Sequence, residues 1–218
     1  MSGKLGPDIV TDGLVLCLDA ADKRSYPGSG NTWYDLSGNN NDALKAGSQS
    51  PEYPLWNSNG YFIFSGGVIG NNYSRFEAVI PALNEITIEA FHYSTNTNGH
   101  IIRANNDDYQ IGPDGYTAGT SYADIRCSIL RLTNIWLYDS LTFNGTVLIG
   151  YRNGNQYSSN TRESYTGIAA STARIGARSD AYAAHYEGNI SIIRIYNRVL
   201  SASEIQQNYK MMKGRYNL

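Results

Sequence analysis

The sequence predicts a single all-β domain. Short segments rich in β-branched and aromatic residues are separated by clusters of Gly, Asn, Ser and Pro, which is the pattern of a sandwich or barrel. The composition agrees, because the chain contains 22 Gly and 18 Tyr and only 17% of its 218 residues are charged. Gly, Asn, Ser and Thr are weak helix formers, so long helices are disfavoured.

The expected strands follow from alternation and from turn signals. The segment 86–90 alternates apolar and polar residues, whereas Ile190–Tyr196 is almost entirely apolar and should lie centrally. Asn-Gly pairs at 144–145 and 153–154 mark hairpin turns. The strands predicted in this way are Leu14–Leu18, Tyr61–Phe64, Ile86–Tyr93, His100–Ala104, Tyr109–Ile111, Ser121–Leu132, Ile135–Asn144, Val147–Arg152, Ala173–Gly176 and Gly188–Tyr196.

One short helix is expected over residues 201–213. Ser201 and Glu204 have the spacing of a capping box, and Leu200 with Ile205 forms a hydrophobic staple around it. Ile205, Tyr209 and Met212 then share one face, which we expect to pack on an edge of the sandwich.

Charge and hydropathy exclude several functions. The net charge is −2 and no long basic run occurs, so a nucleic-acid partner is not expected. The apolar runs are too short for insertion into a membrane. Residues 1–7 lack the apolar core of a secretory signal, which favours folding in a cytoplasm. Cys17 and Cys127 lie in apolar runs and are expected as buried thiols without a disulfide.

Four stretches, taken in order, resemble a known family. They are Asp12–Ala20, Trp33–Asn41, Ile86–Phe91 and the segment from Tyr186 to Ile205. Together they are similar to the laminin-G-like branch of the concanavalin A-like lectin/glucanase superfamily. This resemblance implies a jelly-roll sandwich of two antiparallel sheets with a short C-terminal helix. Residues 12–218 would form this one domain and residues 1–11 an N-terminal arm.

The resemblance also suggests a biological setting. The insertion Ser25–Trp33 gives the first stretch the form that is common in virion proteins of tailed phages. This implies a non-enzymatic virion protein, either a capsid decoration or a head-fibre or tail-associated module, made in the host cytoplasm. Its partners would be capsid or tail proteins, further copies of itself and host-surface glycans. A free-standing carbohydrate-binding module is the alternative, and a glycoside hydrolase a third.

Glu85 and Glu89 are the residues that would support the hydrolase. They are four residues apart on one strand and would point to the same face. This layout is similar to the Glu-x-Asp-x-Glu motif of retaining glycosidases on this fold, but Thr87 replaces the central Asp. The other interpretation is that Glu85 begins the strand and Glu89 lies on its solvent face. We therefore predict no catalytic residues.

We also expect no metal or other cofactor, with calcium left as an alternative. The acidic residues with which family members bind calcium are mostly replaced in this chain. Asp19, Asp35 and Glu187 remain, but they are far apart in the sequence. The three histidines have no metal-ligand spacing.

Aromatic and amide side chains in loops are the candidate sugar contacts. Sugars stack on aromatic rings and form hydrogen bonds with amides and carboxylates. Tyr is equally suited to strands and protein interfaces, and for Trp33 and Trp136 a core position is favoured. The predicted carbohydrate-binding residues are Trp33, Tyr34, Tyr73, Asn105, Asp107, Tyr116, Tyr157 and Tyr182.

Overall fold

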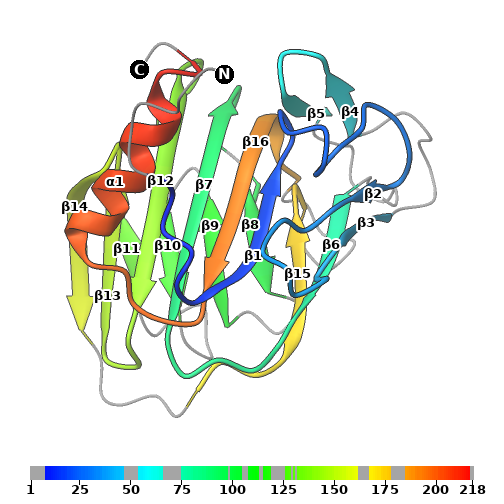
Figure 1. Cartoon of the computed structure of the whole chain (residues 1–218). Coiled ribbons are helices and arrows are strands. Elements are labelled where there is room, and N and C mark those ends of the chain that lie inside the picture. The colour runs from blue at the N-terminus through cyan, green and yellow to red at the C-terminus, as the bar shows by residue number, and fades with distance from the viewer. Residues whose placement is uncertain are drawn as a thin grey trace.

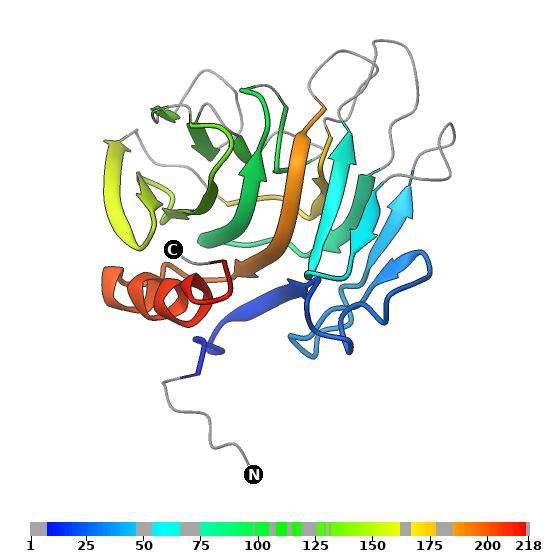
Figure 2. The ribbon, with the colours of Figure 1, turned by 90° about the horizontal axis from the view of Figure 1, so that it is seen from above.

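The computed structural model describes residues 8–46, 54–65, 75–97, 99–104, 108–112, 115–118, 126–128, 130, 132–161, 167–177 and 185–216. These residues form two facing sheets and one helix that lies outside one of them (Figure 1, Figure 2). We call the sheet that carries the helix the front sheet and the other the back sheet. The predicted all-β sandwich with a short C-terminal helix is confirmed.

The front sheet is built around one long apolar strand. Its strands are β1 (Leu14–Asp19), β4 (Leu55–Asn57), β5 (Tyr61–Ser65), β7 (Ile86–Ser94), β12 (Trp136–Phe143), β13 (Val147–Arg152), β14 (Asn155–Thr161) and β16 (Glu187–Tyr196). Their order is β14-β13-β12-β7-β16-β5-β4. Strand β16 pairs with β7 along one side, and with β5 and then β1 along the other. Its predicted central position is confirmed.

The back sheet contains shorter strands. They are β2 (Thr32–Trp33), β3 (Ala43–Ala46), β6 (Arg75–Ile80), β8 (Ile102–Ala104), β9 (Tyr109–Gly112), β10 (Gly115–Ala118), β11 (Arg126–Ser128) and β15 (Ser171–Ile175). Their order is β11-β10-β9-β8-β15-β6-β3-β2, and each strand is antiparallel to its neighbours. The sequence did not predict β2, β3, β4, β6, β10 or β14. Most of these are too short to show a period, and β14 is polar on both faces.

Aromatic rings fill the space between the sheets. Trp33 is fully buried, with its ring centroid 4.8 Å from that of Phe62 and 5.3 Å from that of Phe76. These three residues come from β2, β5 and β6, so the cluster joins the two sheets. Cys17 and Cys127 are buried and free, as expected. Within the described residues, the chain has no helix of the length and apolarity that a membrane crossing requires.

Helix α1 (Ala202–Lys213) begins as the sequence predicted. Ser201 is the N-cap, and both hydrogen bonds of the capping box with Glu204 are present. Leu200 and Ile205 are fully buried in one cluster, which confirms the staple. The helix lies on the outer face of the front sheet beside β12 and β14 (Figure 1). The described part of the N-terminal arm is held under it, because the backbone N–H of Val10 donates to Asn208 Oδ1 at 2.8 Å.

The turn between β2 and β3 covers the outer edge of β1. Asp35 accepts hydrogen bonds from the backbone N–H groups of Cys17 at 2.8 Å, Ser37 at 2.9 Å and Asn41 at 3.1 Å. The N–H of Leu36 donates to the carbonyl of Cys17 at 2.8 Å. Unpaired strand edges invite pairing with other chains. The motif Asp35–Asp42 therefore protects an edge that β16 leaves open.

We predict that Asp35→Ala destabilises the domain by about 2–4 kcal/mol, because it leaves three partly buried N–H donors without their acceptor. Urea unfolding measures the effect. The exposed Lys23→Ala serves as the control, with a change of less than about 0.5 kcal/mol. Equal stability of Asp35→Ala and the wild type would show that the turn does not support β1.

Candidate functional site

Two of the predicted sugar contacts are core residues. Trp33 and Tyr116 are both 0% exposed. Trp33 packs against Phe62 and Phe76, and the Tyr116 hydroxyl donates to the carbonyl of Tyr151 at 3.1 Å. A ring enclosed on both faces cannot stack on a sugar, so the prediction was wrong for these two residues.

Two other predicted residues are exposed but lie apart. Tyr34 is 44% exposed and follows β2, which is the last strand of the back sheet. Tyr157 is 48% exposed and belongs to β14, at the opposite edge of the sandwich (Figure 1). These two residues do not form one site. Tyr73, Asn105, Asp107 and Tyr182 lie outside the described residues, so their assignment stays a prediction.

The carboxylates considered for catalysis do not form an open pair. Glu89 is 0% exposed and lies beneath α1, where Asn208 Nδ2 donates to both of its oxygens at 3.1 Å. Arg194 Nη1 lies 3.4 Å from Glu89 Oε2, and burial raises the pKa of Glu89. The expectation that Glu89 lies on a solvent face was therefore wrong, because the helix covers this part of the sheet. Glu85 accepts from the N–H of Val199 at 3.4 Å.

The carboxylates considered for calcium lie in three separate places. Asp19 accepts from Arg215 Nη1 at 2.7 Å, Asp35 holds the turn over β1, and Glu187 accepts from Asn96 Nδ2 at 2.7 Å. In the part of the chain that the structure describes, no group of three or more His, Cys, Asp or Glu side chains is placed to hold a metal ion.

A buried ionic network lies between the sheets near Tyr116. Asp139 accepts from Arg152 Nε at 2.8 Å and from Arg152 Nη2 at 3.0 Å, and His92 Nε2 lies 3.1 Å away. Burial alone would raise the pKa of Asp139, but the hydrogen bonds from His92 and Arg152 outweigh it and lower the pKa to about 2. All three side chains are buried, so this network is part of the core.

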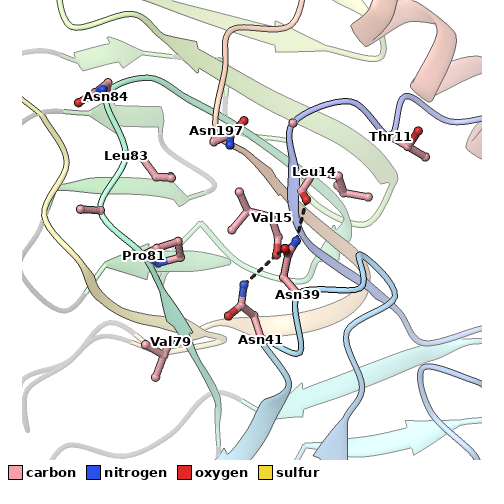
Figure 3. A pocket seen from close by; sticks show the side chains of 12 residues that line it. Thr11, Leu14, Val15, Asn39, Asn41, Val79, Pro81, Leu83, Asn84 and Asn197 are labelled. Atoms are coloured by element: carbon pink, nitrogen blue, oxygen red, sulfur yellow. Dashed lines mark hydrogen bonds between the residues drawn. The ribbon is translucent and has the colours of Figure 1, made fainter.

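An open pocket of about 650 Å³ lies at the other end of the sandwich. It forms where β1 and the end of β16 approach the segment that joins β6 to β7 (Figure 3). Four asparagines line it, namely Asn39, Asn41, Asn84 and Asn197. They come from three regions of the sequence: the turn between β2 and β3, the segment between β6 and β7, and the end of β16.

The fold fixes each side of this asparagine pocket. Asn39 Nδ2 donates to the carbonyl of Leu14 at 2.9 Å, and Asn41 Nδ2 donates to that of Val15 at 2.9 Å (Figure 3). On the other rim, the N–H of Asn197 donates to the carbonyl of Gly13 at 2.8 Å. Gly13 has a φ of 75°, and a Cβ there would lie 2.8 Å from Asn197 Oδ1. Glycine is therefore required for this close approach.

The chemistry of the asparagine pocket is polar and uncharged. No lining residue is ionisable. Amide groups both donate and accept hydrogen bonds, which matches hydroxyl groups. Val79, which is 68% exposed, and Pro81 add apolar surface. The sequence indicated Asn39 and Asn41 only as part of the family stretch Trp33–Asn41 and gave no sign that Asn84 and Asn197 would join them.

The chain belongs to the family whose model is described as the Concanavalin A-like lectin/glucanases superfamily (Laminin_G_3), which matches residues 65–206. No curated protein matched the chain. The resemblance inferred from the sequence motifs is confirmed at the level of this superfamily.

Solved structures share the fold. The binding domain of botulinum neurotoxin DC, in complex with rat synaptotagmin II, has a TM-score of 0.64 at 17% identity, over 93% of this chain and 52% of that one. A second match is domain 4 of AbnA, an arabinanase from Geobacillus stearothermophilus, solved in complex with arabinotriose. Its TM-score is 0.62 at 15% identity, and the match covers 90% of this chain and 98% of domain 4. Trypanosoma rangeli sialidase has a TM-score of 0.61 at 19% identity, and the match covers 94% of this chain and 34% of the sialidase. The chain thus spans about half of the neurotoxin domain.

We predict that the buried network makes stability fall in acid. A carboxylate with a folded pKa of about 2 stabilises the fold above its unfolded pKa of about 3.9, and this contribution is lost as the pH falls towards 2. The difference in free energy of unfolding between the wild type and Asp139→Asn should therefore shrink by about 2 kcal/mol between pH 5 and pH 2. Urea unfolding across this range measures it, and a constant difference would contradict the prediction.

Proposed function

We propose that this chain is a non-enzymatic lectin-like module that binds uncharged sugars in the asparagine pocket. The observation that carries the proposal is a pocket of about 650 Å³ whose lining includes four amide side chains and the hydroxyl of Thr11 and contains no ionisable side chain. Sugar hydroxyls are matched by groups that both donate and accept hydrogen bonds. The exposed surface of Val79 and Pro81 suits the C–H groups of a sugar ring.

The relatives are consistent with a binding role. Domain 4 of AbnA was solved in complex with arabinotriose, and a binding domain of botulinum neurotoxin DC in complex with SialylT. The cell entry of botulinum neurotoxin type C is described as dependent on two ganglioside molecules. These ligands belong to those proteins, but they support the use of this fold for glycan recognition.

The absence of catalysis is part of the proposal. A retaining glycosidase needs two carboxyl groups about 5–5.5 Å apart that both face the sugar. Glu89 is enclosed by α1 and held by Asn208 and Arg194, so it supports the position of the helix. The alternative, a glycoside hydrolase, predicts release of reducing sugar that both Glu85→Gln and Glu89→Gln abolish.

We further propose that the module is part of a phage particle, as a capsid decoration or a head-fibre or tail-associated protein. The support is the sequence of the first motif, with its insertion Ser25–Trp33, and the low content of charged residues. In this setting the partners are capsid or tail proteins and further copies of the chain. Light scattering should detect a homo-oligomer, and a reconstruction of the native particle should contain the chain. A monomer that never co-purifies with a particle would contradict this part, leaving the free-standing carbohydrate-binding module.

We predict that the double variant Asn84→Ala/Asn197→Ala binds glycans at least about tenfold more weakly, because two ligand hydrogen bonds of about 1 kcal/mol each are lost. A glycan array with neutral, sialylated and bacterial polysaccharides identifies the ligand, and titration calorimetry measures its affinity. Asn31→Ala, which changes an exposed asparagine outside the pocket, is the matched control.

The salt dependence of the glycan affinity distinguishes binding by uncharged amides from binding by charge attraction. Because the pocket has no ionisable residue, the affinity should be nearly unchanged between about 50 and about 500 mM NaCl, a range over which the Debye length falls about threefold. The absence of any hit, or binding restricted to acidic glycans and abolished by salt, would contradict the proposal.

A further inference from the structure

A second group of aromatic rings lies on the outer face of the front sheet. Tyr93 of β7 pairs with Trp136 of β12, and Asn189 of β16 pairs with Tyr93 on its other side. Paired residues of neighbouring strands point to the same face of a sheet. Phe91, two residues before Tyr93, shares this face and packs in the cluster beneath α1. The side chains of Tyr93, Trp136 and Asn189 therefore point outwards, away from the core between the sheets.

The segment that follows α1 completes this group. The Tyr216 ring stacks on Trp136 with centroids 4.1 Å apart and on Phe91 at 4.8 Å. Tyr61 of β5 approaches Trp136 at 5.5 Å, and Tyr93 approaches it at 5.8 Å. Strands β5 and β12 are separated by β16 and β7, or about 14 Å, so the indole of Trp136 must extend across the sheet. We call Tyr61, Tyr93, Trp136 and Tyr216 the aromatic platform.

The aromatic platform is rigid yet only half-buried. All four rings keep part of their surface accessible, unlike the fully buried Phe91 beneath them. The Tyr216 hydroxyl donates to the carbonyl of Gly60 at 2.9 Å, which ties the end of the chain to the turn between β4 and β5. Rings that are held in place before binding lose little conformational entropy when a ligand stacks on them.

Polar groups surround the aromatic platform. Asn189 is half-buried and lies opposite Tyr93 on the neighbouring strand. Asn57 of β4 lies opposite Tyr61 of β5. Near the start of β16, Glu187 and Asn96 are joined by a hydrogen bond of 2.7 Å. Rings flanked by amides and a carboxylate suit a ligand with an apolar face and hydroxyl edges.

We propose that the aromatic platform is a second carbohydrate site, which binds an extended uncharged glycan by stacking sugar rings on Trp136 and Tyr93. This inference rests on the proposed lectin-like function and adds a ligand class and a second location. Strand β16 begins beside the platform at Glu187 and ends beside the asparagine pocket at Tyr196. Its ten residues span about 30 Å, so one long polysaccharide could occupy both sites and gain avidity.

Tryptophan fluorescence tests the aromatic platform directly. In a Trp56→Phe background only Trp33, which is fully buried, and Trp136 remain as indoles. Titration with arabinotriose and with neutral xylo-, cello- and malto-oligosaccharides should give a saturable change in emission from Trp136. The same response should persist in Asn84→Ala/Asn197→Ala, because the asparagine pocket is a separate site.

Calorimetry on single variants gives the second readout. Trp136→Ala and Tyr93→Ser should each weaken binding at the platform about tenfold or more, for the oligosaccharide that changes the Trp136 emission. Tyr93→Ser provides the test if Trp136→Ala does not fold. Tyr209→Ala is the matched control, since it removes a half-buried ring that contacts Tyr138 outside the platform.

Three outcomes would overturn the inference. The first is the absence of a saturable change in Trp136 emission with every oligosaccharide that the wild type binds on the array, which removes the platform and keeps the asparagine pocket. The second is an emission change that disappears in Asn84→Ala/Asn197→Ala, which assigns the response to the pocket. The third is a change in Trp136 emission that occurs without sugar as the protein concentration rises, together with a dimer in light scattering. This result would make the platform an interface between copies of the chain.

Discussion

The structure depends on the placement of β16 in the middle of the front sheet. This nearly continuous apolar strand is paired on both sides, by β7 along one edge and by β5 and β1 in succession along the other. One of its faces packs on the core between the sheets, and on the other face Ile192, Arg194 and Tyr196 contact α1. Both proposed binding surfaces follow from this arrangement, because one lies where β16 begins and the other where it ends.

Protection of exposed edges and faces then shapes the surface. The turn after β2 covers the outer edge of β1, and the amides of Asn39 and Asn41 that bond to β1 also line the asparagine pocket. Helix α1 covers the part of the front sheet that contains Glu89, Arg194 and Asn208, and so encloses a carboxylate that would otherwise face solvent. The uncovered remainder of that face carries the aromatic platform. The same elements that stabilise the sheet therefore decide which groups a ligand can reach.

Local patterns in the sequence predicted the fold well. The capping box at Ser201 and the apolar run in β16 act over a few residues, and both were found as expected. The alternation in β7 correctly predicted a strand, but its polar face is buried beneath α1. The sites could not be predicted in this way. Asn41, Asn84 and Asn197 meet only because strands distant in sequence cross at one end, and Tyr61, Tyr93 and Trp136 meet only through strand register. Trp33 and Tyr116 were chosen as loop aromatics, but packing between the sheets buries them.

The most direct test of this account is amide chemical-shift mapping of the labelled protein during titration with the best neutral oligosaccharide from the array. The account predicts two separate groups of perturbed residues. One should centre on Asn41, Asn84 and Asn197, and the other on Tyr93, Trp136 and Asn189. Perturbations confined to the polar edge strand β14, or the absence of saturable shifts with any neutral sugar, would contradict it.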